Sequence, residues 1–213
     1  MTAACRAPQH PNRIVSRRRS RRRTALAGAG AAVAALLLTA CGSGGVSGGS
    51  GNTNFVAGKD GIDTAGEGDR QTAPDLSGRT IDGKQLDVAD YKGKVVVVNV
   101  WGSWCSPCRA EADSFAKVAK ESASKGVQFV GINTRDTSTT PAVEFEKAHG
   151  ITYPSLYDPA GRLLLRFRKG TLNPQAIPST LILDRDGRIA ARTLQPLSEE
   201  KLHEMLDPVV AEK

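Results

Sequence analysis

Val95–Val100 constrains the fold more than any other part of this sequence, because it is a near-continuous apolar run rich in β-branched residues. A strand that is apolar on both sides is typical of the centre of a sheet covered on both faces. Directly after it, Cys105 and Cys108 are separated by two residues, and a helical pattern runs from Pro107 to about Ser124. A buried strand, a loop with a cysteine pair and a helix therefore follow one another along the chain.

The remaining elements predict an α/β fold, with a mixed central sheet flanked by helices on both faces. Thr80–Leu86 is expected to form a small hairpin that extends the domain on its N-terminal side, with Asp82-Gly83 at its turn. The residues expected to be buried in the helix after the cysteines are Ala110, Phe115, Val118 and Ala119. The other expected elements are a strand at Val127–Ile132, a helix at Pro141–His149, a strand or short helix at Leu163–Phe167, a hairpin of Thr180–Leu183 and Ile189–Ala191, and a helix at Ser198–Val210.

The excess of basic residues is confined to one end of the chain. Residues 1–40 contain eight arginines and no acidic residue, whereas the whole chain has 29 Lys and Arg against 22 Asp and Glu. Without this segment 21 basic and 22 acidic side chains remain, so the rest of the chain lacks the charge of a nucleic-acid-binding protein. A content of 39% hydrophobic residues is enough to bury a core, which excludes disorder for most of the chain.

Residues 1–40 are expected to be a lipoprotein signal peptide. Ala25–Ala40 is an apolar stretch of 16 residues, shorter than the roughly 20 that a membrane span needs. It ends in Leu38-Thr39-Ala40-Cys41, which resembles the lipobox of bacterial lipoproteins. A diacylglycerol on Cys41 would anchor the chain at the outer face of the cytoplasmic membrane. Ordinary cleavage at small residues and an uncleaved anchor are the alternatives.

Residues 41–72 are expected to be a flexible tether. Gly42–Gly51 has the composition of a Gly/Ser linker, and the polar stretch up to about Thr72 shows no hydrophobic periodicity. The folded domain is therefore expected to span residues 73–213, beginning near Ala73-Pro74.

The spacing of Cys105 and Cys108 predicts thiol–disulfide chemistry. Because Cys5 leaves with the signal peptide and Cys41 carries the lipid, these two are the only free sulfurs of the expected mature chain. A helix N-terminus favours the thiolate, which is the nucleophile in disulfide exchange. Cys105, the first and more exposed, is expected to attack and Cys108 to resolve the mixed disulfide, while Pro107 suits an early helical position.

Two other roles for the cysteine pair are less well supported. A zinc site needs four ligands, yet there is no second cysteine pair, and His149 and His203 lie in different elements. A static disulfide that closes so short a loop adds little stability. We therefore expect no metal, and no cofactor other than the redox-active disulfide Cys105–Cys108.

Lys94–Glu111, with its Trp104-Cys105-Ser106-Pro107-Cys108 motif, resembles the active-site segment of the TlpA/ResA-like thioredoxin family. Members of this family are membrane-tethered thiol–disulfide oxidoreductases of bacteria. The resemblance continues through Tyr157-Asp158-Pro159 and Ile177–Asp184 and covers roughly residues 73–210. It implies a thioredoxin fold.

The resemblance also implies roles for individual residues. Pro178 falls at the family's cis-proline, where the backbone of the preceding residue, here Ile177, pairs with the substrate chain. Glu111 stands where ResA-like members keep an acid able to move protons to and from the resolving thiol, and a solvated first-turn glutamate is the alternative. Asn99 replaces the buried Asp of thioredoxin, as it does in ResA-like members.

Three residues around the motif are assigned structural roles. Trp101 and Trp104 are expected to be packing and rim residues, with Trp104 supporting the site rather than choosing its substrate. Arg109 is expected to be a surface residue. The alternative is that its positive charge lowers the pKa of a thiol in the neighbouring cysteine pair.

The family resemblance implies an extracytoplasmic reductase that acts on the cysteines of apocytochrome c. Such members take electrons from a membrane thiol carrier of the CcdA type, and we expect protein dithiol or disulfide substrates and a monomeric chain. A DsbE/DsbA-like oxidase of secreted thiols is one alternative, because Ser106-Pro107 between the cysteines does not decide the direction of electron flow. A metal- or haem-handling carrier on the same scaffold is an alternative of another class. Gly102 stands where a peroxiredoxin needs Thr or Ser, which disfavours that chemistry.

Overall fold

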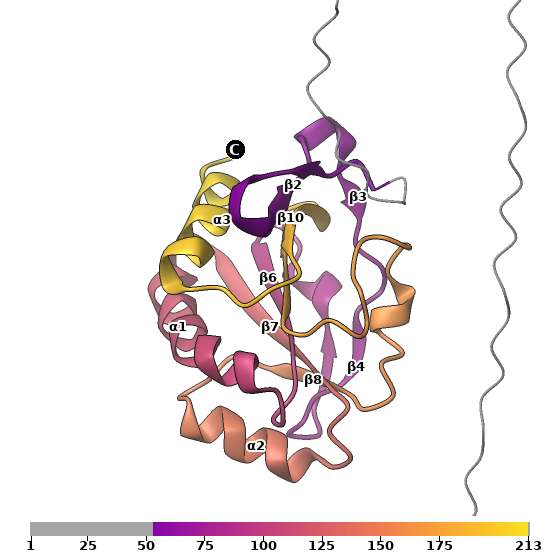
Figure 1. The fold of residues 1–213 in the computed structure, drawn as a ribbon, viewed down its shortest axis with the longest axis vertical. Helices are drawn as coiled ribbons and strands as arrows, with labels where there is room; N and C mark the ends of the chain where they lie inside the picture. The colour runs from indigo at the N-terminus through magenta and orange to yellow at the C-terminus, as the bar shows by residue number, and fades with distance from the viewer. Residues whose placement is uncertain (1–52, 213) are drawn as a thin grey trace, which may run out of the picture. The chain divides into compact units, whose positions relative to one another are not determined.

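The computed structural model describes residues 53–212, and β6 (Val95–Trp101) lies in the middle of its main sheet (Figure 1). All seven residues of β6 are buried. The strand pairs in parallel with β7 (Val127–Thr134) and antiparallel with β9 (Ser179–Leu183). The predicted central strand is therefore confirmed.

The main sheet is mixed. Its strands are ordered β1 (Val56–Ala57), β2 (Ile62–Thr64), β10 (Arg188–Thr193), β9, β6, β7 and β8 (Ser155–Asp158), and β3 (Gln71–Thr72) also pairs with β10. Within the described residues, only the β6–β7 and β7–β8 pairs are parallel. The predicted hairpin is present as β4 (Ser77–Arg79) and β5 (Gln85–Asp87), with Gly83 at positive φ in its turn. Short helical turns occupy Lys59–Gly61, Glu67–Asp69, Val88–Tyr91, Ala123–Lys125 and Leu164–Arg166.

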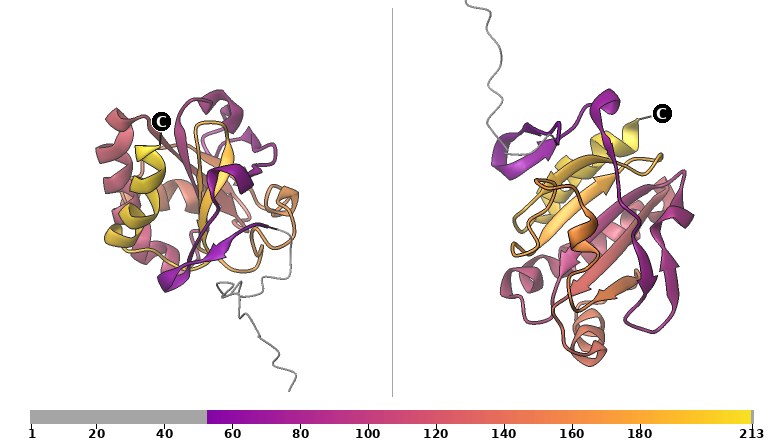
Figure 2. Two further views of the ribbon diagram at one scale, coloured as in Figure 1. Left: turned by 90° about the horizontal axis from the view of Figure 1, so that it is seen from above. Right: turned by 90° about the vertical axis from the view of Figure 1, so that its right-hand side faces the viewer.

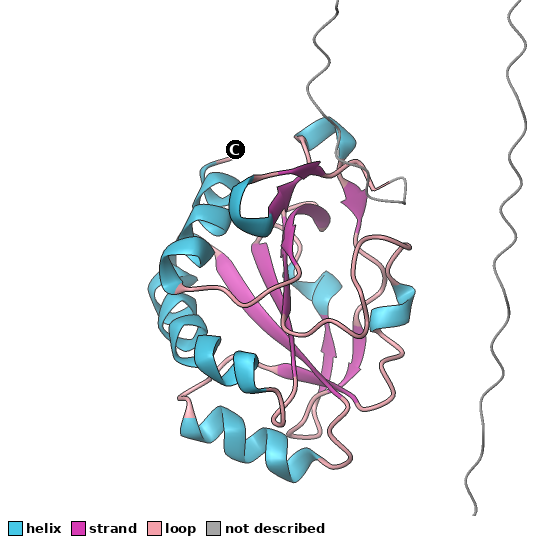
Figure 3. Cartoon of the chain, viewed as in Figure 1, coloured by secondary structure: helices cyan, strands magenta, loops and turns pink. Residues whose placement is uncertain are grey.

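The longer helices cover one face of the sheet. α1 (Ser106–Ser122) and α3 (Glu199–Ala211) lie side by side against it (Figure 2), and α2 (Thr139–Ala148) follows β7. The opposite face is covered by the hairpin and by short turns rather than by a long helix (Figure 3). The predicted α/β class, a mixed sheet flanked by helices, is confirmed, but helical cover of the second face is limited to these turns.

Side chains of β6 alternate between the two faces, which explains why the whole strand is apolar. Val95 and Val97 pack in the cluster formed with α1 and α3. Val96, Val98 and Val100 pack in the cluster on the side of the hairpin. Each face therefore requires its own set of β-branched residues from the same strand.

The buried face of α1 differs in part from the predicted one. Phe115 and Val118 are buried as predicted, and Ala119 is half-buried. Ala110 is exposed, contrary to the prediction, and the neighbouring Glu111 is buried instead. Alanine is small enough to be buried or exposed, so Ala110 did not indicate which face of the helix is buried. A buried acid requires hydrogen-bond partners, and the sequence alone does not reveal them.

The predicted tether of residues 41–72 is wrong for residues 53–72. This segment contains β1, β2 and β3, and both β2 and β3 pair with β10. Arg70 ties it to the rest of the domain, because its side chain is 6% exposed and pairs with Asp184 at 3.0 Å and Glu212 at 2.6 Å. Strands of two or three residues held by backbone hydrogen bonds produce no periodic side-chain pattern. The domain therefore begins well before Ala73.

The predicted signal peptide and Cys41 lie outside the described residues. Within residues 53–212, no helix is long and apolar enough to span a bilayer.

Candidate active site

Cys105 and Cys108 are joined by a disulfide at the N-terminus of α1. Cys105 is the N-cap residue, and its Sγ accepts a hydrogen bond of 3.2 Å from the backbone N–H of Cys108. Pro107 lies in the first turn, where its missing N–H leaves no helical hydrogen bond unmade. After reduction, the same N–H and the positive end of the helix dipole favour a thiolate on Cys105.

Solvent exposure does not distinguish the two cysteines as predicted. Cys105 is 3% exposed and Cys108 is 2% exposed in the oxidised protein. The expectation that Cys105 is clearly the more exposed sulfur is therefore wrong. The two sulfurs differ in position instead, since Cys105 caps the helix and Cys108 lies inside it.

The Ile177–Pro178 peptide bond is cis, as the family resemblance implied. Pro178 is buried and directly precedes β9, which pairs with β6, so the two strands bring this bond to the cysteines. The carbonyl oxygen of Ile177 lies 3.9 Å from Cys105 Sγ. A backbone acceptor beside the sulfur is suitably placed to pair with an extended chain.

Glu111 is a buried acid with two hydrogen-bond partners. Its side chain is 2% exposed, and its carboxylate accepts hydrogen bonds from Asn99 Nδ2 at 3.0 Å and from the backbone N–H of Leu197 at 2.9 Å. Asn99 Nδ2 also donates to Thr180 Oγ1 at 3.3 Å. Burial raises the pKa of Glu111 to about 7, and the two hydrogen bonds to the carboxylate oppose this rise. The alternative of a solvated first-turn glutamate is therefore wrong.

Trp101 and Trp104 have the contrasting environments that were predicted. Trp101 is buried, stacks on Phe145 with ring centroids 4.5 Å apart, and donates to Ser155 Oγ at 3.3 Å. Trp104 is 50% exposed at the rim. Arg109 is exposed, as predicted, and its Nη2 donates to the Ser103 carbonyl at 2.6 Å.

Asp136 is a site residue that the sequence reasoning missed. It is buried, and its carboxylate accepts from Ser103 N at 2.9 Å, from Ser103 Oγ at 2.5 Å and from Asn133 Nδ2 at 2.6 Å. It thereby joins the loop after β7 to the loop that carries the cysteines. Because β6 and β7 are parallel, their carboxyl ends meet at one edge of the sheet, and an acid just after the second strand was the available signal.

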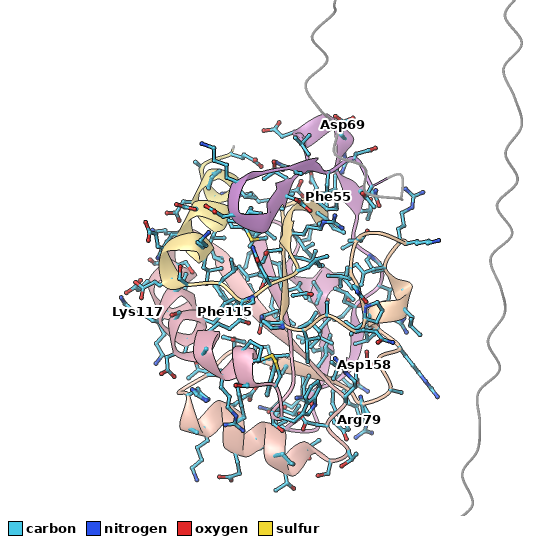
Figure 4. The ribbon with its side chains drawn as sticks, in the orientation of Figure 1. Phe55, Asp69, Arg79, Phe115, Lys117 and Asp158 are labelled. Atoms are coloured by element: carbon cyan, nitrogen blue, oxygen red, sulfur yellow. A yellow bond between two sulfur atoms is a disulfide. The ribbon has the colours of Figure 1, made fainter. Side chains whose placement is uncertain are left out.

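Neither histidine considered for a metal site is bonded to the cysteines. His149 pairs with Asp113 at 2.7 Å. Within residues 53–212, the one group of side chains with metal-ligand spacing is Glu121, Glu199 and His203, and Lys117 already lies 2.6 Å from Glu199. Figure 4 shows Lys117 on the outer side of α1, opposite to Phe115.

This fold and this cysteine site are those of the thioredoxin-like thiol–disulfide oxidoreductases. The sequence matches the Redoxin family over residues 67–207. The chain belongs to this family.

Named relatives agree with this classification. Thioredoxin-like protein YneN of Bacillus subtilis (strain 168) is 32% identical over 138 residues, which cover 64% of this chain and 78% of the relative. Thiol-disulfide oxidoreductase ResA of the same organism is 27% identical over 135 residues, covering 63% of this chain and 72% of the relative. A secreted thiol-disulfide isomerase from Corynebacterium glutamicum has a crystal structure that superposes with a TM-score of 0.68, at 33% identity, covering 76% of this chain and 99% of that one.

Proposed function

We propose that this protein is an extracytoplasmic reductase of protein disulfides, with the cysteines of apocytochrome c as substrate and a membrane thiol carrier of the CcdA type as electron donor. The observation that carries the proposal is the position of Cys105, whose Sγ caps α1 and lies 3.9 Å from the carbonyl oxygen of Ile177 beside the cis-proline. The similarity to ResA supports the reductive direction.

The proposed reaction transfers two electrons from the protein dithiol to a substrate disulfide. The Cys105 thiolate attacks one substrate sulfur, the substrate S–S bond breaks, and the other substrate sulfur leaves as a thiolate that takes up a proton. The Cys108 thiol then loses its proton and attacks Cys105 Sγ, which releases the second substrate sulfur and forms the Cys105–Cys108 disulfide. The membrane donor reduces this disulfide again. The disulfide is the only redox group that this cycle requires.

Glu111 is proposed to accept the proton from Cys108. It lies three residues after Cys108, which is one helical turn along α1. With a pKa of about 7, its carboxyl is partly ionised at neutral pH and can take up or give back a proton. Asn99 holds the carboxylate but cannot itself accept the proton, because an amide does not titrate.

The proposed location follows from the N-terminal sequence. A signal peptide at residues 1–40 and a lipid on Cys41 would hold a monomeric domain at the outer face of the cytoplasmic membrane. The Corynebacterium glutamicum relative is a secreted protein, which supports the extracytoplasmic location. Palmitate labelling of the full chain, compared with a Cys41→Ser variant, tests the anchor.

A DsbE/DsbA-like oxidase or isomerase of secreted thiols is the second candidate. It is favoured by the similarity to the Corynebacterium glutamicum protein, which is described as an isomerase. The reduction potential of the chain from Gly42 to Lys213 separates the two candidates. A value below about −220 mV supports the reductase, whereas a value near about −120 mV supports an oxidase and contradicts the cytochrome assignment.

Trapping experiments test the roles of the two cysteines. Reduced Cys108→Ser protein should accumulate a mixed disulfide with a peptide that contains an oxidised Cys-x-x-Cys motif, because the resolving sulfur is missing. Reduced Cys105→Ser protein should form almost none. Mass spectrometry reads both outcomes, and the reverse pattern would assign the attack to Cys108.

A further inference from the structure

Arg135 has a backbone conformation that is unusual for its type. It directly follows β7 with φ of 60°, in the left-handed region that costs a non-glycine residue about 1 kcal/mol or more. Its neighbours Thr134 and Asp136 are 1% and 4% exposed, whereas Arg135 itself is exposed. The surroundings therefore impose this conformation on a residue whose side chain faces solvent.

Asp136 is the residue that fixes this turn. Its carboxylate receives the backbone N–H and hydroxyl of Ser103 and the amide of Asn133, and its carbonyl accepts from the Tyr157 hydroxyl at 3.0 Å. These bonds join the turn to the loop just before Cys105. The position of Arg135 relative to the cysteine loop is consequently set by buried hydrogen bonds.

The side chain of Arg135 lies on the rim tryptophan. Its guanidinium carbon is 4.6 Å from the centroid of the Trp104 ring, within cation–π range. Gly102 allows the indole to fold back on the loop, since a Cβ at this position would lie 2.7 Å from Trp104 Nε1. Trp104 is nevertheless 50% exposed and directly precedes Cys105. The two side chains thus form an exposed platform beside the attacking sulfur.

The hydrogen-bond donors of this platform are free. Across residues 53–212, no carboxylate or carbonyl is bonded to the guanidinium of Arg135, and no acceptor is bonded to Trp104 Nε1. Arg70 and Arg192, by contrast, are each bonded to carboxylates. A guanidinium stacked by its face still presents its N–H groups at the edge, where they fit a carboxylate.

Neither nearby acid is bonded to the Arg135 guanidinium. Asp136 is already occupied by the loop, and the carboxylate of Asp158 accepts the backbone N–H groups of Arg162 and Leu163. Arg109, in the first turn of α1, is bonded to the carbonyl of Ser103 on the cysteine loop. The exposed guanidinium of Arg135 is complementary to an acidic side chain.

We propose that Trp104 and Arg135 form a docking platform for an acidic side chain that lies within a few residues of the reactive cysteine in the substrate polypeptide. The proposal rests on the proposed disulfide exchange and specifies which substrates it favours. The carboxylate pairs with the edge of the Arg135 guanidinium while the substrate backbone runs beside Ile177.

The test uses reduced protein and three peptides, each with one internal Cys-x-x-Cys disulfide and with Glu, Gln or Lys at the flanking positions. Wild-type protein should reduce the Glu peptide about tenfold faster in kcat/KM than the Lys peptide at low salt, and high salt should shrink the difference. Arg135→Gln should abolish this preference while leaving the Gln peptide within about twofold, and Arg135→Glu should reverse it. Arg188→Gln, an exposed arginine on β10, is the matched control and should keep the preference.

Two further readouts keep the outcomes distinct. If Arg135→Gln still reduces the Glu peptide faster than the Lys peptide, the platform is overturned. It is also overturned if Arg135→Gln loses the same fraction of its reduction rate on all three peptides, because the substitution would then act on the cysteine itself. The pH dependence of Cys105 alkylation reports the pKa of this thiol and would change if the substitution acted on the cysteine. We expect it to be unchanged in Arg135→Gln. If the wild-type protein reduces none of the peptides, the proposed exchange activity itself has failed.

Discussion

Replacing Glu111 by Gln should remove a pH dependence of stability that this buried acid imposes. The pKa of Glu111 rises from 4.5 to about 7 on folding because burial penalises the carboxylate. Below pH 4.5 both folded and unfolded chains carry the proton, so the contribution is fully present. Between about pH 4.5 and 7 the unfolded chain loses its proton first, and stability falls until the native carboxyl has ionised as well.

The size of the effect follows from the same shift. A rise from 4.5 to about 7 corresponds to about 3 kcal/mol of unfolding free energy lost by the wild type across this range. In Glu111→Gln the amide oxygen can accept the Leu197 N–H, and a flipped Asn99 can offer its oxygen to the new NH₂ group. The unfolding free energy of the variant therefore carries a pH-independent offset of about 1 kcal/mol, and its side chain at position 111 does not titrate.

Guanidinium chloride unfolding of the oxidised protein at pH 5, 6, 7 and 8 measures this difference. The stability of Glu111→Gln minus that of the wild type should increase by about 2.5 kcal/mol from pH 5 to 8. Glu121→Gln, on the same helix with a side chain 48% exposed, is the control and should run parallel to the wild type. Parallel curves for Glu111→Gln would refute the reasoning, because they would mean that the native carboxyl titrates like an unfolded one.

Two substitutions test the packing that supports the site. Arg70→Ala should destabilise the protein by about 2 kcal/mol, because it leaves the partly buried Glu212 without its cation. Denaturant unfolding measures this change, and a loss of unfolding free energy under about 0.5 kcal/mol would contradict the stabilising role of the ion pair. Gly131→Ala should cost about 2–3 kcal/mol, since the new Cβ would lie 2.1 Å from Ser155 Oγ, and its melting temperature should fall well below that of Gly68→Ala, where nothing lies within 4 Å.

Several parts of the fold and site followed from local sequence. The apolar run of β6 was predictable because a strand buried on both faces must be apolar at every position. The cysteine pair was predictable because its spacing matches one helical turn after a strand. The last helix was predicted at Ser198–Val210 and is observed at Glu199–Ala211, with Ser198 as its N-cap. The cis bond before Pro178 was expected only through the family resemblance, since most X–Pro bonds are trans.

Other features depend on contacts between distant segments. Glu111 resembles a solvated first-turn acid in sequence, and only the donors from Asn99 and Leu197 make its burial possible. Arg135 and Asp136 gain their roles from the parallel pairing of β6 and β7, which places two loops at one edge. β1, β2 and β3 are held through their backbones, so their side chains carried no pattern.

The N-terminal strands also set how far a lipid-anchored form of this protein can work from its membrane. If Cys41 carries the lipid, only 14 residues lie between it and Val56, where β1 begins. Covalent geometry limits such a span to about 50 Å, however it runs, against roughly 110 Å for a tether ending at Ala73. In Figure 4, Phe55 next to β1 lies in the upper part of the domain, and Asp158 at the end of β8 lies in its lower half. An electron donor embedded in the bilayer would thus have to meet the disulfide within this shorter reach.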